Sequence, residues 1–474
     1  MWDCGRVNAQ PEVDVVVVGG GPAGENVAGR CAAGGLAVVV VERELVGGEC
    51  SYWGCIPSKT LIRPGDVIAS ARRAPGAAEA VTGRIDATAA FAQRDYMTST
   101  WSDAGQVSWL DSEGIRLVRG KGRLTGPRTV EVDQADGSVQ RLTARRAVVL
   151  ATGTGAAIPP IPGLAEARPW DNRTATEAKD VPRRLLVLGG GAVGAELAQA
   201  FRRLGADEVT VIEGSDRLLA REEPFAGRDV QEAFEAEGII VLTGARMTAA
   251  HREGSDGPVV ATLEDGRELT GDEILVAVGR RPSTAGLGLE TVGLEAKAGR
   301  FVDTDDQLRV LGVDGGWLYA VGDCNGRALL THMGKYHGRL AGDHILGRDV
   351  SDVASNGAVP RVTFTDPQVC AVGLTEAQAR EAGIDVRTVT YGTGNVPGAY
   401  TKGNGIKGTS QLVVDQSRGV IVGATFTGPE MQELLHSATI ALVGEVTLDR
   451  LWHAVPSFPT VSEVWLRLLE AYGL

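Results

Sequence analysis

The sequence has little of what marks several other classes of protein. Its 474 residues carry 47 basic against 60 acidic side chains, a formal net charge of −13, so the basic surface typical of nucleic-acid binding is missing. No apolar run approaches the roughly 20 residues of a membrane-spanning helix. Residues 1–13 show no charged-then-apolar signal pattern. We therefore expect a cytoplasmic protein that binds neither nucleic acid nor membrane.

Aromatic residues and cysteines are also scarce. Aromatics make up 5% of the chain, whereas glycine occurs 64 times, which favours a fold with many tight turns. Of the six cysteines, only Cys50 and Cys55 lie close together, and no second pair or histidine cluster completes a zinc site, so no metal is expected. A close pair in a cytoplasmic chain is more often catalytic or metal-binding than structural. The remaining cysteines are predicted to be small buried residues: Cys4, Cys31, Cys324 and Cys370.

The segment Val13–Gly24, VDVVVVGGGPAG, is an apolar run that enters a glycine turn and continues into a helix-like stretch. A second apolar run then ends at an acid, Glu42, whose side chain can accept hydrogen bonds from ribose hydroxyls. This context makes the glycine pattern a dinucleotide fingerprint, in which the helix N-terminus favours a pyrophosphate. Its three glycines are Gly19, Gly21 and Gly24.

The same design recurs at Arg184–Gly194, RLLVLGGGAVG, again followed by a helix-like stretch and an apolar run that ends at an acid, Glu213. The three glycines of this second fingerprint are Gly189, Gly191 and Gly194. An acid at the end of the second strand repels a 2′-phosphate, which favours NAD over NADP. Arg217 and Arg221 follow closely and leave NADP as the alternative.

From Pro360 onward the pattern changes to alternating strands, with helices expected at 375–382 and 432–443. This pattern is typical of an antiparallel sheet. The predicted fold class is therefore α/β, with two Rossmann-like dinucleotide-binding domains and a C-terminal α+β domain.

The cysteine loop reads GGECSYWGCIPSKTLIRP over residues 47–64. On a regular helix the Cα atoms of Cys50 and Cys55 would lie roughly 8–9 Å apart. A disulfide requires less than about 7 Å, so a bonded pair excludes a regular helix here. Tyr52 and Trp53 inside the loop either stack on a planar substrate or pack beneath the loop.

Together, GGxCxxxGCIPSK, the two fingerprints, ATG, GRRP and YAVGD resemble the pyridine nucleotide–disulfide oxidoreductases, the family of lipoamide dehydrogenase, glutathione reductase and mercuric reductase. The resemblance implies a homodimer. It also implies an FAD-binding domain at 1–154 and 282–355, an NAD(P)-binding domain at 155–281 and a dimerisation domain at 356–474.

The resemblance further implies roles for individual residues. Lys59 is expected near the flavin and paired with Glu196, while Cys55 is the flavin-proximal sulfur and Cys50 the thiol that attacks substrate. The implied FAD-binding residues are Gly19, Gly21, Gly24, Glu42, Lys59, Thr152, Gly153, Asp323, Leu330 and His332. The implied nicotinamide-binding residues are Gly189, Gly191, Gly194, Glu213 and Gly279.

One position departs from the family. The family's C-terminal motif is His-Pro-Thr followed two residues later by Glu, but here Phe458 stands at the histidine position before Pro459, and Glu463 is retained. Phenylalanine carries no proton, so efficient thiol exchange of the usual kind is in question. His453 lies five residues upstream of Phe458, and this offset argues against His453 taking the role of the family's histidine. The chain also lacks the C-terminal cysteine pair of mercuric reductases, so mercury reduction is not expected.

Three functions remain open. The favoured one is an enzyme that passes electrons between NAD(P)H and a small disulfide or dithiol through FAD and a Cys50–Cys55 disulfide, in either direction. The second is a diaphorase whose flavin reduces a quinone directly, for which Phe458 argues. The third is a redox-sensing or scaffold protein that holds FAD without turnover, against which Lys59 and Glu196 argue.

Overall fold

The computed structural model describes residues 13–295 and 299–474, and Cys4 lies outside them. The described residues form two compact units. Unit 1 contains those of Met1–Tyr52, Ser99–Gly155 and Arg280–Ser355. Unit 2 contains those of Trp53–Thr98, Ala156–Gly279 and Asn356–Leu474. No helix in the described part of the chain is long and apolar enough to cross a membrane.

Unit 1 is built on a seven-stranded sheet in the described residues, with strand order β3-β2-β1-β6-β5-β4 and with β16 beside β6. Strands β3, β2, β1, β6 and β16 run parallel, and every residue of β1 is buried, as expected for a parallel strand covered on both faces. The strands are β1 (Val13–Val18), β2 (Val38–Glu42), β3 (Arg116–Arg119), β4 (Lys121–Gly126), β5 (Thr129–Asp133), β6 (Val139–Leu150) and β16 (Leu318–Ala320).

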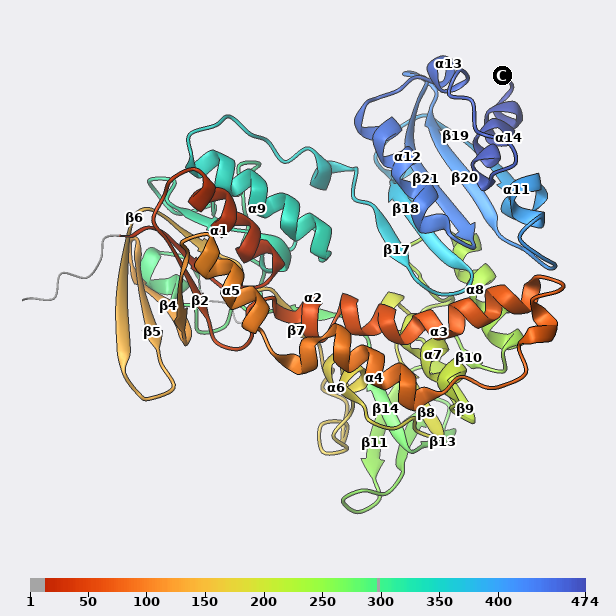
Figure 1. Cartoon of the computed structure of the whole chain (residues 1–474), viewed down its shortest axis with the longest axis horizontal. Helices are drawn as coiled ribbons and strands as arrows, with labels where there is room; N and C mark the ends of the chain where they lie inside the picture. Colours follow the sequence, from red (N-terminus) through yellow and green to blue (C-terminus); the bar gives the residue numbers. More distant parts are fainter. Residues whose placement is uncertain (1–12, 296–298) are drawn as a thin grey trace, which may run out of the picture. The chain divides into compact units, whose positions relative to one another are not determined.

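Two helices of unit 1, α1 (Pro22–Ala33) and α9 (Thr331–Ile345), pack directly against each other (Figure 1). Their backbones approach so closely that a Cβ atom at Gly338 would lie 2.6 Å from the carbonyl oxygen of Ala23. The glycines of α9 therefore permit this packing. The remaining α-helices of the unit are α2 (Gly48–Tyr52) and α5 (Ala104–Ser112).

Unit 2 contains a second parallel sheet, of strand order β10-β9-β8-β14. Its strands are β8 (Arg184–Leu188), β9 (Glu208–Ile212), β10 (Ile240–Leu242) and β14 (Glu273–Val276). Helices in this part are α3 (Cys55–Arg73), α4 (Ala87–Met97), α6 (Asn172–Glu177), α7 (Ala192–Leu204) and α8 (Pro224–Ala236). An antiparallel sheet accompanies them, formed by β11 (Met247–Arg252), β12 (Val259–Leu263) and β13 (Glu268–Gly271).

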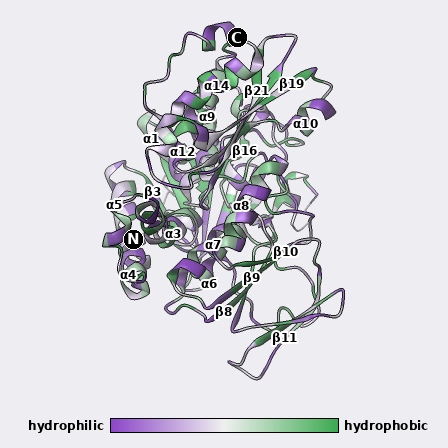
Figure 2. Ribbon diagram, turned by 90° about the vertical axis from the view of Figure 1, so that its right-hand side faces the viewer, coloured by the Kyte–Doolittle hydropathy of each residue, from purple (hydrophilic) through white to green (hydrophobic). Residues whose placement is uncertain are grey.

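The C-terminal part of unit 2 is a five-stranded antiparallel sheet with order β17-β18-β21-β20-β19. Its strands are β17 (Arg361–Thr363), β18 (Gln368–Gly373), β19 (Val386–Gly392), β20 (Thr409–Asp415) and β21 (Val420–Gly428). Helix α12 (Met431–Val443) packs on β18 and β21, and α14 (Val464–Tyr472) packs on β19 and β20, around a separate apolar core. In Figure 2 the strand β21 is coloured hydrophobic, whereas the short helix α10 (Glu376–Glu381) is hydrophilic.

The predicted fold class is confirmed. Two parallel sheets are entered by glycine turns, and an antiparallel sheet with helices follows at the C-terminus. The predicted helices at 375–382 and 432–443 correspond to α10 and α12. The boundaries proposed for the FAD, NAD(P) and dimerisation domains remain predictions.

Candidate functional site

Seven of the ten residues expected to bind FAD lie at one edge of the unit 1 sheet, whereas Lys59 belongs to unit 2. Strands β2, β1, β6 and β16 are parallel and adjacent, so their carboxyl ends share an edge. Such an edge is where open α/β sheets bind ligands. The predicted residues follow these strand ends directly: Gly19, Gly21 and Gly24 after β1, Glu42 at the end of β2, Thr152 and Gly153 after β6, and Asp323 after β16.

The glycine turn after β1 is shaped for a group that approaches the backbone. Gly19 has φ +110°, and a Cβ atom there would lie 2.3 Å from the carbonyl oxygen of Ala151. A Cβ atom at Gly24 would lie 1.9 Å from the carbonyl oxygen of Gly19. At Gly21, by contrast, the nearest atom to such a Cβ is the Cα of Gly48 at 3.9 Å. Gly21 precedes α1 without a side-chain cap, so the N–H groups of the first helical turn remain available to an anion.

Glu42 is held in a fixed orientation. Its Oε2 accepts a 2.6 Å hydrogen bond from the Gly20 N–H, and its Oε1 accepts a 2.7 Å bond from the Glu44 N–H. Each oxygen keeps a further lone pair for a ribose hydroxyl. Nearby, the buried hydroxyl of Thr152 has no hydrogen-bond partner among the described residues. A buried hydroxyl without a partner is costly, so this edge fits a bound polar group such as the FAD cofactor.

Asp323 lies in the glycine-aspartate turn η4 (Gly322–Asn325). Burial raises the pKa of its carboxyl group, although a 2.7 Å hydrogen bond from the Thr154 hydroxyl and the positive charge of Arg280 oppose the change. Arg280 donates a 2.7 Å bond to that hydroxyl and also lies 3.4 Å from the Glu49 carboxylate. The sequence reasoning missed Arg280, although the GRRP motif that contains it was visible.

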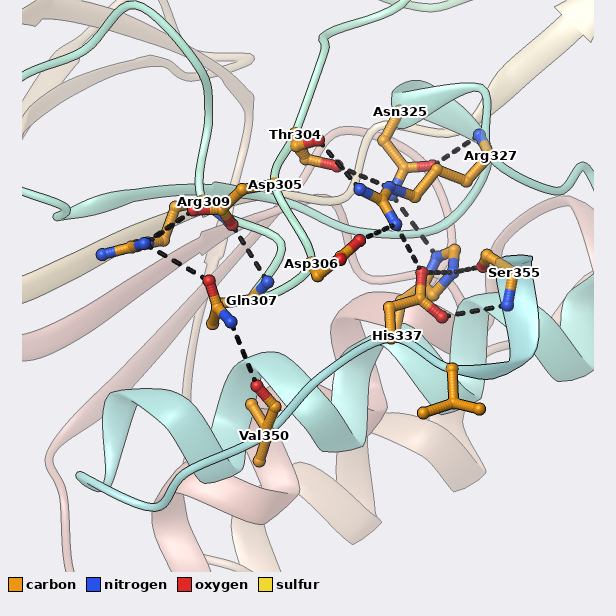
Figure 3. Close-up of polar contacts among 12 residues, drawn as sticks. Thr304, Asp305, Asp306, Gln307, Arg309, Asn325, Arg327, His337, Val350 and Ser355 are labelled. Atoms are coloured by element: carbon orange, nitrogen blue, oxygen red, sulfur yellow. Dashed lines mark hydrogen bonds and ion pairs between the residues drawn. The ribbon is translucent and has the colours of Figure 1, made fainter.

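A network of polar side chains is hydrogen-bonded to this turn (Figure 3). His337 of α9 accepts a 3.4 Å hydrogen bond at Nδ1 from the Gly322 N–H, and its Nε2 lies 2.9 Å from the Ser355 hydroxyl. Asp352 accepts a 2.9 Å bond from Arg327. Burial alone would raise the pKa of Asp352, but hydrogen bonds from His337 and Ser355 outweigh it and lower the pKa to about 2.

Two predicted FAD-binding residues sit where α9 begins, beside this network. Leu330 is the N-cap residue of α9 and is half-buried, and His332 lies in the first turn of the helix and is exposed. Their role in binding FAD remains a prediction.

The predicted nicotinamide site lies at the corresponding edge of the second sheet. Strands β9, β8 and β14 are parallel neighbours. The predicted residues follow their ends: Gly189, Gly191 and Gly194 after β8, Glu213 after β9 and Gly279 after β14.

The glycine turn and the acid of this second site repeat the geometry of the first. A Cβ atom at Gly191 would meet nothing within 4 Å. Glu213 accepts 2.6 Å bonds from the N–H groups of Gly190 and Ser215, one at each carboxylate oxygen. Arg217 instead donates to Asp216 and to the carbonyl oxygen of Ala220.

Lys59 and Glu196 form an ion pair within unit 2, with 2.6 Å between Nζ and Oε2. Lys59 lies on α3 and Glu196 on α7, and the Glu196 side chain is only 6% exposed. The second carboxylate oxygen accepts a 2.9 Å bond from the Phe364 N–H, and the Lys59 ammonium lies 4.9 Å from the centre of the Phe364 ring. Sequence reasoning missed Phe364, because it lies about 170 residues from Glu196 and no local motif marks it.

The cysteine loop departs from a regular helix. Cys50 lies in α2 and Cys55 is the first residue of α3, with the non-helical Gly54 (φ −116°, ψ −109°) before it. Both thiols are half-buried. The backbone between the two cysteines is therefore not a regular helix, as a Cys50–Cys55 disulfide would require.

The two aromatic residues of the loop are packed into the protein. Trp53 is 8% exposed, donates a 2.5 Å bond to Glu177 and has the Arg173 guanidinium 4.1 Å from its ring centre. Tyr52 is buried and donates to the carbonyl oxygen of Val46. Packing therefore explains both rings. The other cysteines described, Cys31, Cys324 and Cys370, are buried as predicted.

The two predicted residues of the C-terminal motif, Phe458 and Glu463, differ in exposure. Phe458 is 75% exposed, and His453 is also exposed. Glu463 is buried, and its Oε1 accepts a 2.6 Å bond from Arg467. Its Oε2 has no partner among the described residues.

Comparison with known proteins adds to this geometry. The family model "pyridine nucleotide-disulphide oxidoreductase" matches residues 13–338, and the model of that family's dimerisation domain matches residues 359–468, which supports a homodimer. A dihydrolipoyl dehydrogenase of Haloferax volcanii is 34% identical over 471 residues, covering 96% of this chain and 95% of the relative. A mercuric reductase of Shigella flexneri is 34% identical over 464 residues, covering 97% and 80%. The crystal structure of LpdA from Mycobacterium tuberculosis matches with a TM-score of 0.85 at 28% identity, covering 98% of this chain and all (100%) of that one.

Proposed function

Because this chain belongs to the pyridine nucleotide-disulphide oxidoreductase family, whose members use FAD and NAD(P)H, we propose that it transfers electrons from NADH through FAD and a Cys50–Cys55 disulfide to a small disulfide substrate. In the overall reaction NADH, a proton and one disulfide give NAD⁺ and two thiols. The reverse reaction, oxidation of a dithiol, uses the same residues. The observation that carries the proposal is that Lys59, on the helix that begins at Cys55, forms an ion pair with the buried Glu196 of α7.

The arrangement on α3 supports this chemistry. Cys55 and Lys59 are four residues apart, so they lie on one face of the helix one turn from each other. Cys55 is also the first helical residue, where the N–H groups of the helix start favour a thiolate. A thiolate near an ammonium is the form that attacks or leaves a disulfide sulfur. We therefore assign Cys55 as the flavin-proximal sulfur and Cys50 as the thiol that exchanges with substrate.

The unit 1 sheet edge fits FAD. The glycine turn and the start of α1 would bind the pyrophosphate, Glu42 the ribose, and Asp323 with Thr152 and Gly153 the flavin side of the cofactor. When bound, FAD accepts hydride from NADH and supplies two electrons to a disulfide. We propose that Lys59 contacts the flavin, where its positive charge stabilises the negative charge that the flavin gains on reduction.

The second sheet edge fits NADH better than NADPH. The carboxylate of Glu213 is fixed by two backbone N–H groups at 2.6 Å and keeps lone pairs for the ribose hydroxyls. A 2′-phosphate would be repelled by this charge. Arg217, one of the two arginines that could neutralise such a phosphate, bonds to Asp216 and to a backbone carbonyl oxygen.

A second function is favoured by one observation. The position of the family's proton-carrying histidine holds Phe458, whose ring is 75% exposed and cannot transfer a proton. A quinone needs no thiol exchange, so a diaphorase would lose nothing by this replacement. In that case the cysteine pair would be dispensable.

The variants Cys50→Ser and Cys55→Ser separate the two functions. In the dithiol enzyme each variant loses NADH-dependent reduction of small disulfides to below 1% of wild type, because the exchange needs both sulfurs. Ser58→Ala, also on α3, is the control and should retain activity. Undiminished NADH-dependent reduction of a small disulfide by both cysteine variants would overturn the proposal.

A further inference from the structure

The turn between β17 and β18 is fixed to one face of helix α7. The residues of α7 that hold it are Glu196, Gln199 and Arg203, spaced three and four apart and so on one face. Glu196 accepts from the Phe364 N–H at 2.9 Å. Gln199 exchanges two bonds with the backbone of Asp366, at 2.7 and 3.0 Å.

Charged side chains tie the same turn to helix α3. The Asp366 carboxylate accepts a 2.8 Å bond from Arg203 of α7 and a hydrogen bond from Arg73 of α3. Burial alone would raise the pKa of Asp366, but the charges of Arg203 and Arg73 outweigh it and lower the pKa. Hydrogen bonds and ion pairs therefore hold the turn against α3, which carries Lys59, and α7, which carries Glu196.

These contacts of the turn with α7 and α3 determine where the Phe364 ring lies. The ring is half-buried and its centre is 4.9 Å from the Lys59 ammonium, within the distance at which an aromatic face attracts a cation. Phe364 therefore makes two contacts with the pair: its N–H orients Glu196, and its ring faces Lys59. It belongs to the segment that matches the dimerisation domain, residues 359–468.

We infer that Phe364 is a positioning residue for Lys59, and that through it the dimerisation segment sets the charge presented to the flavin. This inference rests on the proposed contact between Lys59 and the flavin. Lys59 is 34% exposed, and its ammonium pairs with a single oxygen of Glu196. Without the ring, water replaces the aromatic face and the ammonium gains freedom to move. Its stabilisation of negative charge on the flavin then weakens.

The test is the flavin reduction potential of purified holoenzyme, measured by equilibration with a reference dye. Phe364→Leu keeps an apolar side chain but removes the aromatic face. A cation–π contact changes an equilibrium by at most about thirtyfold, and only the part that differs between oxidised and reduced flavin appears in the potential. At 29.6 mV per tenfold for a two-electron couple, the potential becomes more negative by at most about 44 mV. Phe364→Tyr, which keeps the face, should retain the wild-type potential.

The same substitution in a Lys59→Met background shows whether the effect passes through Lys59. The inference predicts that Phe364→Leu then adds no shift. An equal shift in both backgrounds, or no shift in either, overturns it. If Lys59→Met itself leaves the potential unchanged, the proposed contact between Lys59 and the flavin fails, which is a separate result from failure of Phe364. The control Phe225→Leu removes a ring from another apolar core of unit 2 and should have no effect.

Should Phe364→Leu fail to fold, Phe364→Met serves in its place, and the Phe364→Tyr comparison still decides. A potential that differs from wild type in the tyrosine variant as much as in the methionine variant would contradict the inference, because tyrosine retains the aromatic face.

Discussion

Replacing Glu196 by glutamine removes one negative charge from a buried ion pair while keeping the shape of the side chain. Glu196 accepts from Lys59 at 2.6 Å and from the Phe364 N–H at 2.9 Å, one bond at each oxygen. Glutamine has only one acceptor oxygen, so its NH₂ group must face one of the two donors. The pair is therefore broken and a buried donor is left unmatched.

The size of the effect follows from burial. A hydrogen bond between charged groups contributes about 1.5–3 kcal/mol, and loss of one partner of a fully buried pair costs about 3–5 kcal/mol. The Glu196 side chain is 6% exposed but that of Lys59 is 34% exposed, and water compensates part of the loss. We expect the free energy of unfolding to fall by about 2 kcal/mol. The rate of flavin reduction by NADH should fall at least about tenfold, because a fixed ammonium is worth that much when a negative charge develops nearby.

Denaturant unfolding and anaerobic stopped-flow absorbance measure these two quantities. Glu223→Gln is the matched control, since Glu223 is also a buried carboxylate of unit 2 but accepts from the Glu376 N–H instead of pairing with Lys59. The control should leave the rate of flavin reduction within about twofold of wild type. A Glu196→Gln enzyme with unchanged stability and unchanged rate would refute the account of the pair.

Three further predictions concern other parts of the chain. Phe458→His should raise kcat/KM for a small disulfide by about 10²-fold if a missing proton carrier limits exchange, and no gain would show that position 458 does not serve the reaction. Glu213→Gln should narrow the preference for NADH over NADPH in steady-state kinetics, because the charge that repels a 2′-phosphate is gone; an unchanged ratio would contradict this role. The pKa of Asp352 falls from 3.8 to about 2 in the folded protein, so its stabilisation is present above about pH 4 and is lost as the pH falls toward 2. Between pH 5 and 2.5, the free energy of unfolding in urea should therefore fall by about 2 kcal/mol less in Asp352→Asn than in the wild type. The same decrease in both proteins would count against the network in Figure 3.

The sequence predicted those parts of the molecule that depend on neighbours in the chain. The glycine turns around Gly19 and Gly189 are local, since each needs only a strand, a positive φ and a helix start within a few residues. The cysteine spacing likewise requires an interrupted helix if Cys50 and Cys55 bond, and the interruption lies at Gly54. The fold class followed from these elements and their repetition.

The remaining features depend on distant parts of the chain. Phe364 reaches Lys59 only because Asp366 and the residues of α7 hold its turn, and nothing near residue 364 in the sequence indicates that contact. The packing of Trp53 was left open because its partners, Glu177 and Arg173, lie about 120 residues away. Periodicity and motifs report local conformation, whereas these contacts are set by tertiary packing.

If the Cys50–Cys55 pair is a working redox centre, anaerobic titration of the holoenzyme with NADH will reveal it. We expect a broad long-wavelength absorption band after two electrons, from a Cys55 thiolate beside oxidised flavin, and loss of this band in Cys55→Ser. Direct bleaching of the flavin in the wild-type enzyme, with no such band, would contradict the claim and leave the cysteines outside the path of the electrons.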